Sequence, residues 1–172
     1  MADITLETFK NTLKDGIRPN RYWITFTPPV GGRSEKLTFL AKSSSVPGRN
    51  IGEIAVNWQG MAMYLAGDPT FDTWDVTFIQ DYENVARTIM EEWINFIAEV
   101  TRNASNVREE PANYKRDIEV EQLGRSGETL AKYKLIGAFP TTISPVDLSY
   151  DTTDALAEFT VTFRFDYWLR EE

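Results

Sequence analysis

The sequence predicts a mainly β domain with one long α-helix, and three observations support this class. Apolar and polar residues alternate with a period of two in several separate stretches, as they do in half-buried strands. One segment, residues 82–102, instead carries apolar residues at helical spacing. Hydrophobic residues make up 42% of the 172 residues and aromatic residues 13%, which is enough for one packed core. We therefore expect an antiparallel β-barrel or sandwich with a flanking helix.

Period-two alternation predicts strands along most of the chain. The first two stretches are separated by a glycine-containing turn and favour a first hairpin, and the third and fourth favour a second one. No linker divides the strands, and no repeat of fixed period is present, so residues 1–172 are predicted to form a single domain. The alternating stretches are residues 22–27, 37–41, 53–58, 60–68, 71–81, 146–150 and 158–167.

Two helices interrupt this pattern. Thr5 is suited to cap a short helix within an N-terminal arm, residues 1–16, and this helix carries Leu6, Phe9 and Leu13 on one stripe. The long helix opens after Asp81, and its apolar residues predict that it lies across a sheet. The residues of that apolar face are Val85, Ile89, Trp93, Phe96, Ile97 and Val100.

A further hairpin, residues 116–137, places three carboxylates in a row. Alternate positions share one face of a strand, so Asp117, Glu119 and Glu121 are expected side by side. A four-residue loop from Gly124 to Gly127 would partly neutralise this face across the strands and leave Glu121 without an ion pair. The predicted cross-strand pairs are Asp117 with Lys134, Ile118 with Tyr133, Glu119 with Lys132, and Glu121 with Leu130.

Composition argues against several functions. The chain has no cysteine and no histidine, which removes thiol nucleophiles, serine–histidine triads and most zinc sites. A net charge of −8 is opposite to what phosphate binding requires. No segment is typical of a signal peptide or a membrane span, so we expect a cytoplasmic protein without cofactors, metals or a membrane anchor.

Two sets of carboxylates lie close enough in sequence to be candidate sites. Asp151, Asp154 and Glu158 lack the alternation and the central glycine of a calcium loop. Asp68, Asp72 and Asp75 lie at a turn and strand edge, where carboxylates are usually solvated rather than paired for glycoside chemistry. Neither group predicts a site, and we expect no enzyme.

Six segments carry a resemblance that covers nearly the whole chain. They are "RPNRYWITF" (18–26), "SSSVPG" (43–48), "GDPTFDTWDVTFIQD" (67–81), "PANYKRDI" (111–118), "GAFPTTISPVDLSYD" (137–151) and "EFTVTFRFDYW" (158–168). In this order they resemble the tail tube proteins of contractile-tailed bacteriophages. The resemblance is specific because of the ordered set, of which the segments around Asp72 and Trp168 are the sharpest.

The resemblance implies a structural role. Subunits of this family form six-membered rings that stack into a hollow tube, with the sheath protein outside and baseplate and terminator proteins at the ends. The sheets of neighbouring subunits join around the lumen, and viral double-stranded DNA passes through it without specific binding. The implied location is the virion tail, assembled in the host bacterial cytoplasm.

Two sets of residues are candidates for this role. A wall of carboxylates would repel phosphates, so Asp117, Glu119 and Glu121 are candidates for the lumen, with an ion-paired outer surface as the alternative. For contacts between subunits and rings, the resemblance points to the N-terminal arm and to residues 43–67, a loop and hairpin expected to project. The candidate contact residues are Leu6, Phe9, Leu13, Ser45, Val46, Pro47, Met61, Met63, Tyr64 and Trp168.

Alternative functions remain open from the sequence. The same tube architecture serves type VI secretion and phage-derived particles that inject toxins. A carbohydrate-binding β-sandwich would also lack catalytic residues, but it needs exposed coplanar aromatic side chains. Most aromatic residues here fall on the apolar face of a strand, with Trp23 and Trp168 as exceptions.

Overall fold

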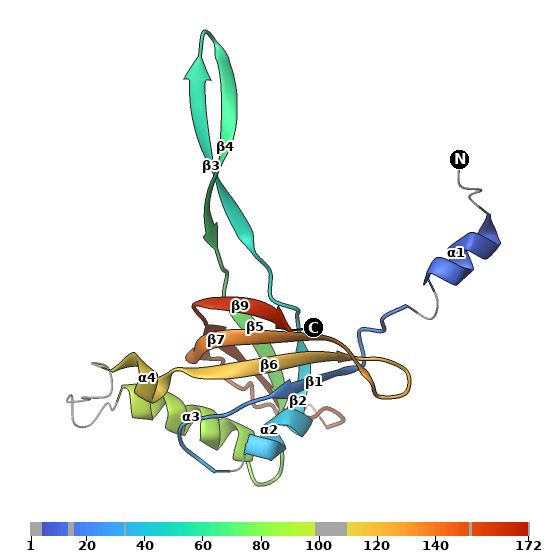
Figure 1. Cartoon of the computed structure of the whole chain (residues 1–172). Helices are drawn as coiled ribbons and strands as arrows, with labels where there is room; N and C mark the ends of the chain where they lie inside the picture. The colour runs from blue at the N-terminus through green and yellow to red at the C-terminus, as the bar shows by residue number, and fades with distance from the viewer. Residues whose placement is uncertain (1–4, 14–15, 33, 99–109, 152, 172) are drawn as a thin grey trace.

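A packed body carries two elements that stand away from it. The structure is a computed structural model and describes residues 5–13, 16–32, 34–98, 110–151 and 153–171. Figure 1 shows the body below, a long hairpin of β3 (Asn50–Trp58) and β4 (Met61–Thr70) rising from it, and helix α1 (Leu6–Leu13) to one side. The molecule therefore offers three separate surfaces: those of the body, the hairpin and α1.

The body is built on one curved antiparallel sheet, which confirms the predicted fold class. The strand order is β1-β6-β7-β8-β5-β2, and β9 also pairs with β7. Non-consecutive neighbours in this order mean that the sheet depends on contacts between distant parts of the sequence. The strands are β1 (Tyr22–Thr25), β2 (Ala41–Ser44), β5 (Trp74–Ile79), β6 (Arg116–Leu123), β7 (Thr129–Ile143), β8 (Glu158–Arg164) and β9 (Tyr167–Glu171).

Strand β7 connects two parts of the sheet. Its first part pairs with β6 on one side and β9 on the other, and its last part, from Phe139, pairs with β8. Between them Gly137 has a φ of +66°, a left-handed conformation that glycine adopts without strain. The segment "AFPTTISP" (138–145) was expected to cross between strands, whereas β7 continues through it as far as Ile143.

The core between the sheet and the helices is largely aromatic. The Phe163 ring lies 5.9 Å from that of Phe26, 5.7 Å from Trp74 and 6.1 Å from Trp93. Both buried indoles are satisfied, because Trp74 donates to the carbonyl of Ser45 and Trp93 to that of Tyr114. Aromatic pairs at these distances contribute beyond the area that they bury, so this core is well specified.

Three helices belong to the body: α2 (Ser34–Leu40), α3 (Val85–Ile97) and α4 (Pro111–Tyr114). Helix α3 confirms the predicted apolar face, since Val85, Ile89 and Trp93 are buried against the sheet. The Asp81 carboxylate accepts the N–H of Val85 at 2.8 Å and so satisfies a first-turn donor of the helix. The predicted position of Val100 and the end of the helix at residue 102 lie outside the described residues.

The prediction of a first hairpin from residues 22–27 and 37–41 is wrong. Residues 34–40 form α2, β1 pairs with β6, and β2 pairs with β5. Leu37 and Leu40 pack toward the core, whereas Phe39 is 72% exposed. Apolar residues three apart share a helical face, so this short run fitted both periods and tertiary contacts decided between them.

Two C-terminal predictions also need correction. No strand forms at residues 146–150, where Leu148 and Tyr150 are exposed. The last predicted strand, residues 158–167, is interrupted at residues 165–166 and continues as β9. At this break the N–H of Asp166 donates to the carbonyl of Ile136, and Lys115 pairs with its carboxylate, so the chain can change its pairing partner.

The β3–β4 hairpin follows the predicted pairing. Its turn, Gln59 and Gly60, has positive φ at both residues, which suits the twist of a two-residue hairpin. All residues of both strands are exposed except Gly67, which is half-buried. Among the described helices, none has both the length and the apolar content needed to cross a lipid bilayer.

Candidate assembly interface

A charged surface covers one side of the strands β1, β6, β7 and β9. The other side of this sheet carries Ile24, Ile118 and Leu135, which are buried in the core. Cross-strand partners place the charged side chains on a common face. We call this the charged face, and its ionisable residues are Asp117, Glu119, Glu121, Lys132, Lys134 and Glu171.

The predicted register of the charged hairpin is wrong by two residues. Glu119 lies opposite Lys134, Glu121 opposite Lys132, and Val120 opposite Tyr133. The extra residues are accommodated by register shifts at both ends of the pairing, next to Asp117 and Leu123. A shift of two keeps every side chain on its face, so the expected row of acids survives although its partners change.

The lysines of the charged face are surrounded by carboxylates. Lys132 Nζ lies 3.0 Å from Glu119, 3.3 Å from Glu171 and 3.8 Å from Glu121. The hydrogen bonds that its ammonium group donates to Glu119 and Glu171 raise the pKa of Lys132 above its ordinary value. The prediction that Glu121 has no ionic partner is therefore wrong, and its carboxylate also accepts a hydrogen bond from the Thr129 hydroxyl at 3.2 Å.

The charged face keeps an excess of negative charge. Lys134 pairs with Asp117 at 3.3 Å, so each of the two lysines has at least one carboxylate partner. Four carboxylates thus surround two ammonium groups on the strands of this face. An anion that approaches the face therefore meets ion-paired lysines and a net negative potential.

Apolar and aromatic residues occupy the outer strands of the same sheet. Trp23 on β1 and Tyr167 and Leu169 on β9 are 39%, 44% and 50% exposed. Strand β1 pairs only with β6, and β9 only with β7, among the strands that the structure describes. A strand with one unpaired side is suited to contact with another chain.

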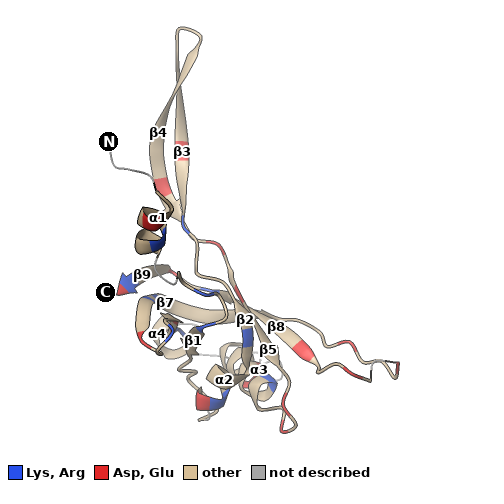
Figure 2. Cartoon of the chain, turned by 90° about the vertical axis from the view of Figure 1, so that its right-hand side faces the viewer, with Lys and Arg blue, Asp and Glu red and all other residues tan. Residues whose placement is uncertain are grey.

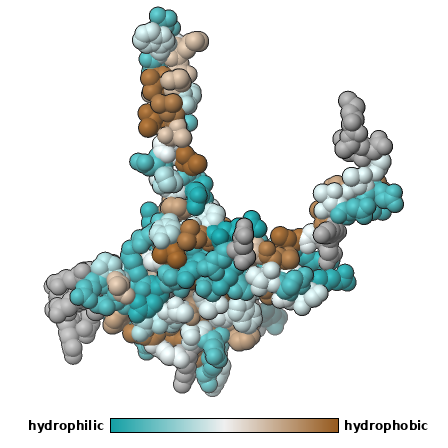
Figure 3. All heavy atoms as spheres, viewed as in Figure 1, coloured by the Kyte–Doolittle hydropathy of each residue, from teal (hydrophilic) through white to brown (hydrophobic). Residues whose placement is uncertain are grey.

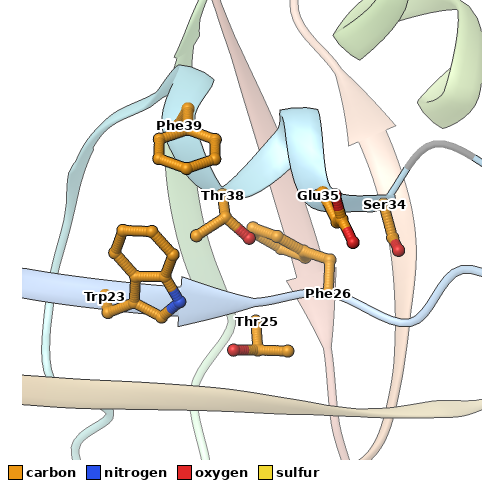
Figure 4. A pocket seen from close by; sticks show the side chains of 7 residues that line it. All are labelled: Trp23, Thr25, Phe26, Ser34, Glu35, Thr38 and Phe39. Atoms are coloured by element: carbon orange, nitrogen blue, oxygen red, sulfur yellow. The ribbon is translucent and has the colours of Figure 1, made fainter.

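A pocket of about 340 Å³ opens beside β1. Figure 4 shows the Trp23 and Phe39 side chains next to each other at one end, and their ring centres are 5.1 Å apart in an edge-to-face contact. Glu35 is the one ionisable residue of the lining, so the pocket offers no acid–base pair. Its lining residues are Trp23, Thr25, Phe26, Ser34, Glu35, Thr38 and Phe39.

One side of the projecting hairpin is entirely apolar. Ile54 pairs with Leu65, Val56 with Met63, and Trp58 with Met61, and residues directly opposite share a face. Their side chains are 40–75% exposed. We call this the hairpin apolar face: Ile54, Val56, Trp58, Met61, Met63 and Leu65.

The two sides of the hairpin differ sharply. Between Glu53 and Ala66 the opposite side carries small or polar residues, with the single aromatic residue Tyr64 paired to Ala55, and Ile51 nearer the body is 65% exposed. Figure 3 shows apolar colour concentrated on the hairpin stem, and Figure 2 shows hardly any charged residue along it. Of the predicted contact residues, Met61 and Met63 therefore lie on the apolar face, whereas Tyr64 lies behind it.

Helix α1 presents a second exposed apolar surface. The Thr5 hydroxyl accepts the N–H of Thr8 at 3.3 Å, which confirms the predicted cap. Leu6, Phe9 and Leu13 are 69%, 59% and 53% exposed, and α1 has no buried residue. The described part of the chain leaves this stripe exposed, and an exposed apolar stripe is suited to contact with another surface.

The remaining predicted contact residues lie nearer the body. The Ser45 carbonyl accepts from Trp74, Pro47 is buried and Val46 is 41% exposed. Trp168 donates to the carbonyl of Gly48 at 2.9 Å and packs edge-to-face on Tyr133. Their placement makes this loop an attachment of the hairpin, and a role in contacts with another chain stays a prediction.

Sequence analysis did not identify Arg49 as part of this attachment. Its guanidinium lies 4.8 Å from the Trp168 ring and 5.5 Å from that of Phe71. Such cation–π contacts fix the direction in which the chain leaves the body toward β3. An arginine directly after "SVPG" gave no local signal, because both rings come from distant segments.

No catalytic centre is visible in the part of the chain that the structure describes. Within it, no three acidic residues lie close enough to hold a metal ion, and no buried side-chain polar atom lacks a hydrogen bond. The carboxylates of the two candidate groups, near residues 68–75 and 151–158, are exposed. Projecting apolar elements and a sheet with unpaired sides are instead typical of a structural subunit that assembles with further copies.

Comparison with known proteins identifies the family. The family described as phage tail tube protein matches residues 17–171, and the chain therefore belongs to the phage tail tube protein family. The chain is 28% identical over 155 residues to tail tube protein gp19 of Enterobacteria phage T4, covering 90% of this chain and 91% of that protein. It is also 28% identical over 170 residues to the tail tube protein of Serratia phage KSP90, with 94% of each chain covered.

Solved structures of contractile machines share the fold. A chain from the sheath/tube terminator of the PVC extracellular contractile injection system has a TM-score of 0.66 at 18% identity, over 91% of this chain and 96% of that one. A chain from the baseplate of the anti-feeding prophage has a TM-score of 0.62 at 9% identity, with 88% and 93% covered. These likenesses confirm the tail tube fold.

Proposed function

We propose that this chain is the subunit of the inner tube of a contractile phage tail, in which six copies form a ring and rings stack into a hollow tube. The observation that carries the proposal is the pair of exposed apolar elements, the hairpin and α1, on a chain of the tail tube family. Such surfaces are unusual on a protein that works alone. The role is structural and requires no enzymatic activity, metal or cofactor.

Electron microscopy of the purified protein over a range of concentrations tests this function. Six-fold rings or smooth hollow tubes are the expected result. A chain that stays monomeric even with the baseplate present, which supplies a nucleus for assembly, contradicts the proposal.

The charged face is the proposed wall of the lumen. Its excess of carboxylates and its ion-paired lysines give DNA phosphates nothing to bind, so the genome slides through without specific contacts. Asp117, Glu119 and Glu121 are the predicted lumen residues, and Glu171 joins them on the same face. The core separates this face from α3, which lies on the outer side of the ring in this arrangement.

Charge reversal on the charged face tests the lumen assignment. Phages that carry Glu119→Lys and Glu121→Lys should assemble tails but release DNA more slowly, because the wall then attracts phosphates. Glu92→Lys, at an exposed position of α3, is the matched control. Equal ejection rates in the natural phage, the double variant and the control would show that the charged face does not line the lumen.

The partners follow from the same proposal. The chain contacts its own copies, the sheath protein outside the tube, and baseplate and terminator proteins at the ends. Its location is the virion tail, after assembly in the cytoplasm of the host. Purified virions should therefore contain the chain, which mass spectrometry of the virion proteins would reveal.

A tube of a related injection device is the second candidate. The fold shared with PVC chains, including one from the sheath–tube complex with a TM-score of 0.56, favours it. If genes for capsid and terminase lie beside the sheath gene, the tube belongs to a phage tail. If those genes are absent and toxin genes lie there instead, the tube belongs to an injection particle.

A further inference from the structure

We infer that strand β9 holds the projecting hairpin in one direction through a latch at the base of the hairpin. The latch consists of Gly48, Arg49, Phe71 and Trp168, of which only Trp168 belongs to β9. While β9 stays paired with β7, the hairpin keeps its direction, and when β9 leaves β7, the hairpin is free to swing. This inference concerns the single chain, goes beyond the proposed function and does not depend on it.

Three contacts join Trp168 to the segment that leads into β3. Its indole N–H donates to the carbonyl of Gly48 at 2.9 Å, and the guanidinium of Arg49 lies 4.8 Å from its ring. The same guanidinium donates to the backbone carbonyl of Trp168 at 3.5 Å. Two consecutive residues are thus held by a ring, a side-chain donor and a backbone acceptor, which restricts both the position and the direction of the chain.

The second leg of the hairpin is tied to the same place. Phe71 directly follows β4, and its ring lies 5.5 Å from the guanidinium of Arg49. The Asn50 amide donates to the Asp72 carboxylate at 2.6 Å, which joins the two legs to each other. Arg49 therefore contacts one ring of the hairpin base and one ring of β9, so that it connects the two elements.

Little else holds the direction of the hairpin. Its two strands are exposed except at Gly67. A Cβ at Gly48 would meet no atom within 4 Å, so the backbone has room to bend just before Arg49. After Arg49 the pairing is irregular between Ile51 and Glu53, which gives a second place to bend. The nine residues of β3 extend about 30 Å, so a bend of roughly 10° at the base would move the tip by about 5 Å.

Strand β9 is suited to act as the moving part of the latch. Among the described strands it pairs with β7 alone, and of its five residues only Trp168 is half-buried, while the others are exposed. Figure 1 shows β9 at the edge of the body from which the hairpin rises. A strand with one neighbour and few buried side chains opens at a low free energy. With the latch closed, the hairpin already has one direction before any partner arrives, which lowers the entropic cost of association.

Distances between two spin labels test the latch, because the natural chain has no cysteine. The labels are attached at Asn57→Cys on the hairpin and Asn95→Cys on α3, both exposed positions. Dilute protein, shown to be monomeric by sedimentation, should give one narrow distribution of distances. Arg49→Ala and Trp168→Ala should each broaden this distribution at least twofold, because either change opens the latch.

A neighbouring residue of β9 provides the matched control. Leu169 follows Trp168 directly, and its side chain lies on the opposite face of the strand, so Leu169→Ala should leave the distribution unchanged. The double variant of Arg49→Ala with Trp168→Ala should be no broader than either single variant, because both residues serve one contact. Amide exchange in β5 and β8 checks the fold of each variant. Arg49 is exposed and lies outside the core, so Arg49→Ala decides the question even if Trp168→Ala does not fold.

Each outcome supports or overturns the latch. Equal widths with the natural latch and with Arg49→Ala overturn it, and so does a broad distribution while the natural latch is intact. Broadening by Leu169→Ala as large as that by Arg49→Ala also overturns it, because the direction would then not depend on the Trp168 contact. None of these results decides whether the chain forms rings and tubes, which electron microscopy tests separately.

Discussion

The body and the projecting hairpin use similar apolar residues in opposite environments. In the body, Trp74, Phe78 and Phe163 are at most 1% exposed and belong to a single core. On the hairpin, Trp58 and Met61 are more than 70% exposed although they alternate as regularly as the residues of any buried strand. Alternation therefore reports which face of a strand will be covered, and it does not report whether the same chain covers it.

This difference assigns the two regions to different equilibria. Core residues act on the free energy of unfolding, since they are buried whenever the chain is folded. Residues of the hairpin apolar face act on association, because they leave water only when another copy arrives. Substitutions in the two regions should consequently change different measurements.

The largest effect is expected in the core. Phe163→Ala should lower the free energy of unfolding by about 3–5 kcal/mol, because it removes a fully buried ring that contacts three others. Met61→Ala on the hairpin should change it by less than about 0.5 kcal/mol. Chemical denaturation of both variants measures the contrast, and equal losses would show that the hairpin contributes to the stability of the isolated body.

The next effect concerns association. Val56→Ser combined with Met63→Ser should raise the concentration needed for tubes by more than about tenfold, since each lost apolar contact weakens binding by about 1–3 kcal/mol. Ala55→Ser with Ala62→Ser, on the opposite side of the hairpin, is the matched control. Sedimentation of assembled material gives both values, and a greater loss in the control pair would reverse the assignment of the two sides.

A smaller effect is expected where β3 and β4 approach most closely. A Cβ at Gly67 would lie 3.0 Å from the backbone carbonyl of Gly52, next to the irregular pairing between Ile51 and Glu53. Gly67→Ala should therefore separate the strands locally and increase amide exchange in the hairpin by roughly tenfold. Gly48→Ala, where a Cβ has nothing within 4 Å, should leave exchange unchanged.

The smallest effect concerns the charged face. Because the pKa of Lys132 is raised above 10.5 in the folded chain, its ion pairs stabilise the fold at lower pH and this contribution is lost above pH 10.5. Glu119→Gln removes the carboxylate that contributes most to the shift and should lower the pKa of Lys132 toward its ordinary value. An NMR titration of the lysine side chains measures this, and an unchanged pKa would show that Glu171 alone holds the ammonium group.

The sequence by itself determined the elements whose pattern is local. The hairpin at residues 53–68, the Thr5 cap of α1, the buried stripe of α3 and the tail tube family could all be predicted from periodicity, capping chemistry and ordered motifs. Alternation also placed Asp117, Glu119 and Glu121 on one face. Each of these signals depends on residues within a few positions of one another.

Only the tertiary structure decided which distant segments meet. Residues 34–40 fitted a strand and a helix equally, and Leu37 became part of a helix because that places it in the core. The register of β6 on β7 moved by two residues, which alternation cannot detect because both registers present the same face. The contact of Arg49 with Phe71 and Trp168 joins three segments whose proximity no local pattern encodes.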